Sequence, residues 1–116
     1  MRQCFEVLKP GGWIRLAVPS LRKLSKLYLS GDAAALKAVY GDGGFYYHKD
    51  TPGERFNYFL REWNHKIVFD EQMLCDLMKE AGFKSATPKE KNESDIPGGW
   101  VHDRLEGESL YVEAQK

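Results

Sequence analysis

The chain has 116 residues, of which 42% are hydrophobic and 29% are charged, and its 17 basic residues balance its 17 acidic residues. This size and composition are ordinary for one globular domain, so residues 1–116 are treated as a single domain. The zero net charge argues against a nucleic-acid partner, because duplex-binding domains usually carry excess positive charge to displace counterions.

The sequence also argues against a membrane partner. No apolar run approaches the roughly 18 residues that a membrane span needs, and Met1-Arg2 is not followed by the apolar core of a signal peptide. Cys4 and Cys75 lie among apolar residues of expected helices, as small buried thiols do in a reducing compartment. We therefore expect a cytoplasmic protein.

The first expected unit is a short helix, a turn and a strand. An amphipathic stretch, Cys4–Leu8, ends at Pro10-Gly11-Gly12, which cannot continue a helix and favours a turn. Residues 13–18 are apolar with one exception and rich in strand formers, so both faces of this strand are expected to be buried. Pro19 ends the strand because it lacks an N–H, and Ser20 can cap a following helix.

Two helices and a loop are expected next. Leucines at helical spacing predict a helix that ends at Gly31, and Asp32 can cap a second helix over residues 33–40. Residues 41–49 then form a loop. Its adjacent aromatic residues could cover a pocket as a lid or could simply anchor the loop to the core: Phe45, Tyr46 and Tyr47.

The middle of the chain carries strong helix signals. Thr51-Pro52-Gly53-Glu54 combines a Thr cap, a Pro in the first turn and a Glu three residues after the cap. An extended segment is expected at residues 65–69, and Asp70 caps a helix over Glu71–Ala81 that Gly82 terminates. The apolar stripe of the helix after Thr51 is assigned to the core: Phe56, Phe59, Leu60 and Trp63.

The C-terminal part is expected to hold two strands separated by a long loop. Phe83 to about Lys89 forms the first strand, and the polar residues 90–107 form the loop, with one anchor at Trp100-Val101. Residues 109–114 alternate apolar and polar side chains and form the final strand.

The most suggestive polar cluster is the run from Arg61 to Lys66, which lies between two apolar segments. His65 has a pKa suited to a general base. The alternative is structural, with Asn64 and His65 capping the helix end while Arg61 is solvated. Metal binding is not expected, since the three histidines show no ligand spacing.

Val7-Leu8-Lys9-Pro10-Gly11-Gly12, followed by an apolar strand, resembles the segment that leads into the fifth strand of class I S-adenosylmethionine-dependent methyltransferases. Later segments are similar to the last third of the same proteins: residues 61–66, 69–71, 77–83 and 108–114. The resemblance implies an α/β fold with part of a Rossmann-like sheet. Three strands would form a mixed sheet in the order 13–18, 109–114, 84–89, with the last strand antiparallel in the middle. A helical insertion, about residues 20–66, would lie above the C-terminal end of the first strand.

The resemblance also implies a site. His65 would be the catalytic base, and Pro19 and Ser20 would contact the cofactor, S-adenosylmethionine. Trp63 could pack against an acceptor or a sulfonium cation. The acceptor would be bound by five residues: Tyr46, Tyr47, Arg61, Trp63 and Asn64.

The family's Gly-rich cofactor loop has no counterpart in the chain. Gly41-Asp42-Gly43-Gly44 and Pro97-Gly98-Gly99 follow no apolar strand and open no helix, so both are interpreted as ordinary loops. Cofactor binding is therefore expected of the complete enzyme, and no catalysis is expected of this chain alone.

Because the resemblance covers about the C-terminal half of the family's domain, strand 13–18 would lack a neighbour on one edge. We expect a second copy, the missing N-terminal half or the N-terminal helix to cover that edge. The chain is then either a fragment or the product of a gene that begins inside the usual domain. Two functions stay open: the acceptor-side half of a methyltransferase, and a non-enzymatic truncated module for self-association or partner binding.

Overall fold

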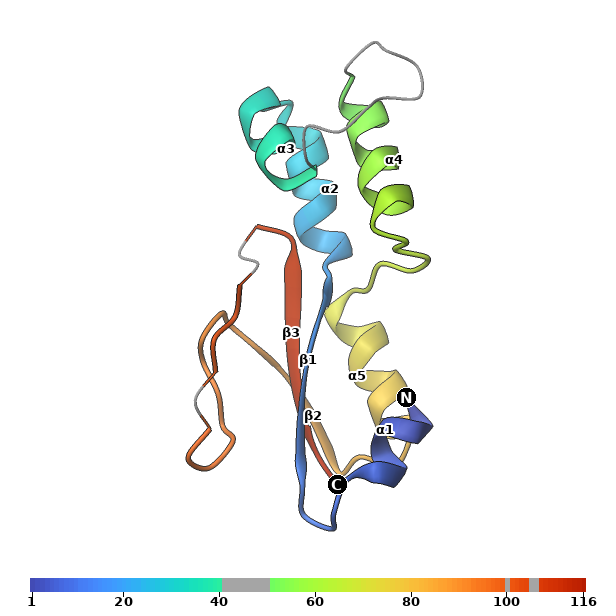
Figure 1. Cartoon of the computed structure of the whole chain (residues 1–116), viewed down its shortest axis with the longest axis vertical. Helices are drawn as coiled ribbons and strands as arrows, with labels where there is room; N and C mark the ends of the chain where they lie inside the picture. Colours follow the sequence, from blue (N-terminus) through green and yellow to red (C-terminus); the bar gives the residue numbers. More distant parts are fainter. Residues whose placement is uncertain (41–50, 100, 105–106) are drawn as a thin grey trace.

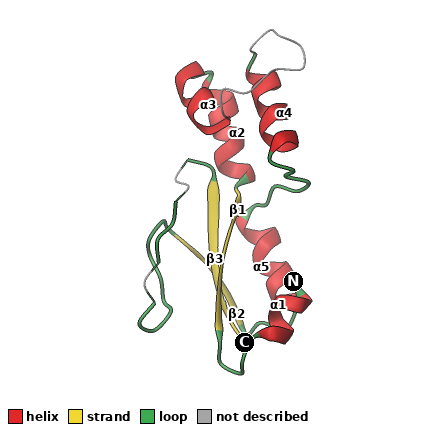
Figure 2. Ribbon diagram, in the orientation of Figure 1, coloured by secondary structure: helices red, strands yellow, loops and turns green. Residues whose placement is uncertain are grey.

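The computed structural model describes residues 1–40, 51–99, 101–104 and 107–116. Three helices form one end of the molecule, and a sheet with two further helices on one face forms the other end (Figures 1 and 2). The elements in chain order are α1 (Arg2–Val7), β1 (Trp13–Pro19), α2 (Leu21–Ser30), α3 (Ala33–Tyr40), α4 (Pro52–Glu62), α5 (Glu71–Glu80), β2 (Ser85–Lys89) and β3 (Ser109–Gln115).

The sheet has the expected strand order, β1-β3-β2, with the last strand in the middle. Both pairings are antiparallel, so the prediction of a mixed sheet is wrong. The reason is topological. β1 and β2 run in the same direction, but β3 separates them and no two parallel strands are neighbours.

One face of the sheet packs on α5. Alternate residues of β3, namely Leu110, Val112 and Ala114, meet Leu74 and Met78 of the helix in a buried core. Asp70 begins α5 as predicted, since its carboxylate accepts a hydrogen bond from the Met73 backbone N–H at 2.8 Å.

The geometry at the end of α5 explains why residue 82 is a glycine. Gly82 adopts φ +109°, and the Gly82 and Phe83 amides donate to the carbonyls of Lys79 and Met78, which closes a Schellman motif. A Cβ at Gly82 would lie 3.0 Å from the Phe5 ring, so the position also sets how closely α1 approaches. Lys116 holds α1 from the other side, because its Nζ donates to carbonyls that include that of Phe5 at 2.6 Å.

The loop between β2 and β3 covers the opposite face of the sheet (Figure 1). Its anchor is Arg15, a polar residue of β1. The guanidinium donates to Asp103 Oδ2 at 2.6 Å and to Glu113 Oε1 at 2.8 Å. It also donates to the carbonyl oxygens of Glu90 and Glu93. The sequence predicted an apolar anchor at Trp100-Val101; Trp100 lies outside the described residues.

Glu113 is buried, with 1% of its surface exposed, although the alternation of β3 put it on the polar face. Besides Arg15, the Ser94 hydroxyl and the Asp95 backbone N–H donate to its carboxylate. Burial raises the pKa of Glu113. These hydrogen bonds and Arg15 lower it by a larger amount, so the net pKa lies below the usual value. The carboxylate therefore stays ionised and fixes the loop.

β1 is an edge strand, and the prediction that both of its faces are buried is wrong. Most of its residues are half-buried and Ala17 is exposed. Gly12 and Ser20 bond to the segment that contains β3, so Trp13, Arg15 and Ala17 direct their backbone groups outward. In the part of the chain that the structure describes, the backbone bonds at this edge come from Phe69, which contacts Pro19 and Leu21 at its end.

The helices α2, α3 and α4 form a second small core around Leu24, Leu36 and Phe59. Predicted caps are confirmed here, since Ser20 begins α2 and Thr51 forms a full capping box with Glu54. The segment at residues 65–69, which was expected to be extended, carries one isolated bridge, between Phe69 and Ser20. The two cores lie end to end, and the radius of gyration of 16.1 Å exceeds the value of about 13 Å typical of this length.

The ion-pair network predicts a large cost for replacing Arg15. Arg15→Gln leaves the carboxylate of Glu113 buried without its cation, so we expect a loss of about 3–5 kcal/mol in the free energy of unfolding, measured by urea denaturation. The control is Arg22→Gln, which breaks the exposed pair with Glu71 and should cost less than about 1 kcal/mol. Equal costs for the two variants would contradict this role of Arg15.

Candidate functional site

A cavity of about 390 Å³ lies where α3, the end of α4 and the segment before β3 meet. Its described lining is mostly apolar, with one imidazole, one indole and one carboxylate: Ala38, Val39, Phe59, Trp63, His65, Gly107 and Glu108. The cavity is at the C-terminal end of β1, since Glu108 pairs with Ser20 there.

The last turn of α4 positions two of the lining residues. Asn64 adopts φ +53°, and the amides of Asn64 and His65 donate to the carbonyls of Arg61 and Leu60 at 3.1 and 2.8 Å. This is a Schellman motif with Asn at the left-handed position, where Asn is tolerated better than most residues. The reversal of the chain carries His65 to the cavity.

Trp63 precedes the chain reversal, and 65% of its surface is exposed. Its predicted place in the core stripe is therefore wrong. The reason is that α4 ends at Glu62, so Trp63 is the cap residue and does not continue the packed face that buries Phe59. Instead its side chain lines the cavity.

The His65 ring lies against the ring of Phe59, with 4.7 Å between the ring centroids and 36° between their planes. Burial lowers the pKa of His65, because the charged imidazolium loses contacts with water. The imidazole is therefore neutral near pH 7, and a neutral imidazole nitrogen can accept a proton from an N–H or O–H group.

Glu108 lies on the other wall. Its backbone is fixed, because its carbonyl accepts a hydrogen bond from the Ser20 N–H at 2.7 Å. Burial raises the pKa of its carboxyl. The neighbouring Gly107 allows a close approach to α3, since a Cβ there would lie 2.9 Å from Val39.

The other predicted site residues lie elsewhere or serve the fold. Arg61 and Asn64 are exposed and do not appear in the described lining of this cavity. The Ser20 hydroxyl is buried and caps α2 by accepting from the Lys23 N–H, while the Pro19 carbonyl accepts from Phe69. The cofactor role of these last two residues stays a prediction. Tyr46 and Tyr47 lie outside the described residues.

The sequence did not single out Glu108. It precedes the final strand, and the expected antiparallel pairing puts the start of that strand beside the end of strand 13–18. This expected pairing is the sequence signal that could have placed Glu108 next to the end of strand 13–18. Apart from it, Glu108 is one acidic residue in a polar loop.

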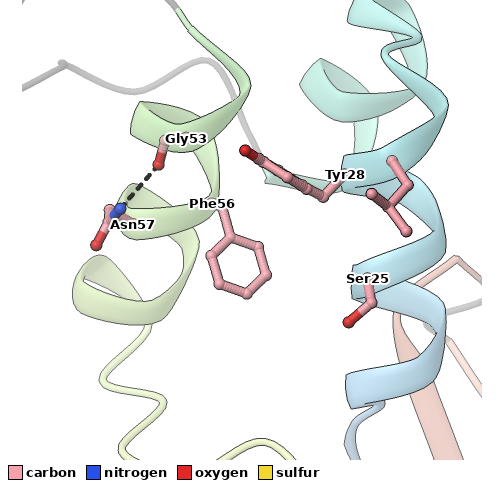
Figure 3. Close-up of a pocket in the computed structure, with 6 residues that line it drawn as sticks. Ser25, Tyr28, Gly53, Phe56 and Asn57 are labelled. Atoms are coloured by element: carbon pink, nitrogen blue, oxygen red, sulfur yellow. Dashed lines mark hydrogen bonds between the residues drawn. The ribbon is translucent and has the colours of Figure 1, made fainter.

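A second cavity, of about 450 Å³, lies between α2 and α4 and is drawn in Figure 3. Tyr28 and Phe56 face each other across it, with ring centroids 6.3 Å apart. Asn57 donates to the Gly53 carbonyl of its own helix. No carboxylate or imidazole is in its described lining, so it lacks the acid–base groups of the His65 cavity.

Comparison of the chain with protein-family models, with curated proteins and with solved structures found no match. In residues 1–40, 51–99, 101–104 and 107–116, no three His, Cys, Asp or Glu residues are grouped as metal ligands. None of the helices in these ranges has both the length and the apolar character needed to cross a membrane.

The site predicts a titration that can be measured. In the folded chain the pKa of His65 should lie below its value in urea, because burial disfavours the charged form. The unfolded chain then takes up a proton first, so the contribution of His65 to stability falls as the pH drops from the unfolded pKa to the folded pKa. NMR titration of the imidazole signals would measure both pKa values.

His65→Gln serves as the control in this titration. It removes one set of imidazole signals and identifies those of His65 among the three histidines. A folded pKa equal to or above the unfolded value would show that the ring is not desolvated as described.

Proposed function

We propose that the chain is the acceptor-side part of an S-adenosylmethionine-dependent methyltransferase. The observation that carries the proposal is the cavity with His65 and Glu108 at the C-terminal end of β1. Residues of α3 and α4, which follow β1 in the chain, form part of its lining. The Lys9-Pro10-Gly11-Gly12 turn before β1 and the strand order β1-β3-β2 also agree with a partial Rossmann-like sheet.

The described residues do not by themselves fit S-adenosylmethionine. The buried Ser20 hydroxyl is occupied by the α2 cap. Gly98 and Gly99 lie between β2 and β3, and so they do not open a helix after a strand as a nucleoside-binding loop does. We therefore expect the cofactor to be held largely by another polypeptide segment, and no catalysis by this chain alone.

In this proposal His65 acts on the acceptor. Its neutral imidazole would accept the proton that an amine or hydroxyl group releases when it is methylated. Trp63 would form the apolar wall against which the acceptor packs, and Phe59 would support the ring of His65. Methyl transfer depends chiefly on positioning, so a cavity with one base provides the groups that the acceptor side needs.

The first test is an NMR titration of the chain with S-adenosylhomocysteine. If the acceptor side adjoins the cofactor, we expect weak but saturable shifts of the amides at residues 17, 18, 20, 21 and 61–66. Adenosine is the matched control, because it lacks the amino-acid end of the ligand and should give smaller shifts. An unchanged, well-dispersed spectrum at millimolar S-adenosylhomocysteine would contradict the proposal.

One observation favours a second function, that of a non-enzymatic module for self-association or partner binding. Trp13, Arg15 and Ala17 present outward backbone groups along the edge of β1. Such an edge is a template for another strand. A second copy of the chain is the simplest occupant.

Substitution at Ala17 tests self-association. Ala17→Pro removes an outward N–H without removing a bond to β3, so it should shift a concentrated sample toward the 13.3 kDa mass of one chain in light scattering. Ala17→Ser keeps the N–H and should associate like the unmodified chain. A monomeric unmodified chain at high concentration would contradict self-association through this edge.

A further inference from the structure

We infer that the cavity lined by His65 and Glu108 binds an organic ammonium ion, with the carboxylate of Glu108 as its counter-ion and Trp63 as its aromatic wall. As a statement about the methyl acceptor, this inference rests on the proposed function. As a statement about binding, it rests only on the described lining of the cavity.

The first observation is that the Glu108 carboxylate has no cationic partner in the described structure. No ion pair or side-chain hydrogen bond among the described residues includes it, and burial alone shifts its pKa. A partly desolvated carboxylate without a partner costs free energy that an incoming cation can recover.

The second observation is that the other described lining residues carry no positive charge at pH 7. They include no Lys or Arg, and His65 is neutral at pH 7 for the reason given above. Lys23 is engaged at Ser109, where its Nζ donates to the carbonyl at 2.7 Å. Among the described lining residues, a phosphate or carboxylate ligand would therefore meet a like charge and no counter-ion.

The third observation is the aromatic character of the walls. Phe59 is 1% exposed and forms the base under His65, whereas Trp63 is 65% exposed and leaves an open indole surface at the cavity. Indole is the side chain that binds cations most strongly through its ring face. A carboxylate and an indole in the lining of one cavity suit an ammonium group attached to an apolar or aromatic body.

Three ligands with the same indole ring and different charges test the inference. Tryptamine carries an ammonium group at pH 7.5, tryptophol a neutral hydroxyl and indole-3-propionate a carboxylate. Binding to the 116-residue chain is followed by the amide signals of Gly107 and Glu108 and by the indole N–H signal of Trp63. We expect tryptamine to bind roughly tenfold more tightly than tryptophol, and indole-3-propionate to bind most weakly.

Glu108→Gln should remove the preference for tryptamine and leave the affinity for tryptophol within about twofold, because only the charge of the side chain changes. Glu80→Gln is the matched control. It removes one exposed carboxylate at the end of α5, on the sheet end of the molecule, and should leave the preference intact (Figure 1).

The inference is overturned if tryptophol binds as tightly as tryptamine, if no ligand shifts the cavity signals, or if Glu108→Gln keeps the full preference. The comparison of ligands on the unmodified chain decides the matter even where a variant fails to fold. Tryptamine binding without any response to S-adenosylhomocysteine would support the ammonium site and contradict the methyltransferase proposal. A response to S-adenosylhomocysteine without tryptamine binding would support the methyltransferase proposal and contradict the ammonium site.

Discussion

The antiparallel pairing of β1 with β3 is the interaction on which the rest of the structure depends. It joins segments far apart in the chain, such as Arg15 and Glu113, which are 98 residues apart in sequence. At one end of the ladder it pins α1 through Lys116, and at the other it holds Glu108 beside Ser20. The pairing thus decides both where the N-terminal helix packs and where the cavity forms.

The ladder also gives two carboxylates near or on β3 opposite environments. Glu113 is almost fully buried, yet Arg15, Ser94 and Asp95 compensate its charge and the net pKa is lowered. Glu108 is less buried, but nothing described compensates its charge and its pKa is raised. A buried carboxylate that is fully paired serves the fold, whereas an unpaired one in a cavity is typical of a binding site.

Local chemistry in the sequence predicted the helices well. Ser20, Thr51 and Asp70 act as caps, and Gly31 and Gly82 follow helix ends, because each signal depends on neighbours within a few residues. The strand order came from the family resemblance and not from periodicity.

What the sequence could not predict depends on distant contacts. The burial of Glu113 follows from a loop that folds back over the sheet and from an arginine on another strand. The exposure of Trp63 follows from the position of the helix end, which a stripe of apolar residues does not fix. The role of Glu108 requires the cavity, and the cavity exists only once α3, α4 and the segment before β3 are brought together.

The geometry of the β1 edge limits what can occupy it. Phe69 already bonds at the end of the edge, so a partner strand has Trp13, Arg15 and Ala17 to pair with. Each backbone hydrogen bond contributes only about 1 kcal/mol net, whereas association costs at least about 4 kcal/mol. Backbone pairing over so short a ladder leaves little surplus.

A stable occupant must therefore also bury apolar surface. Ile67 precedes Phe69 in the sequence and is 53% exposed. Met73 follows Phe69 and is 43% exposed. At about 25 cal/mol per Å² of apolar area, side chains of this kind can supply what the short ladder lacks. A partner that pairs with β1 should therefore bring apolar side chains of its own as well as a strand.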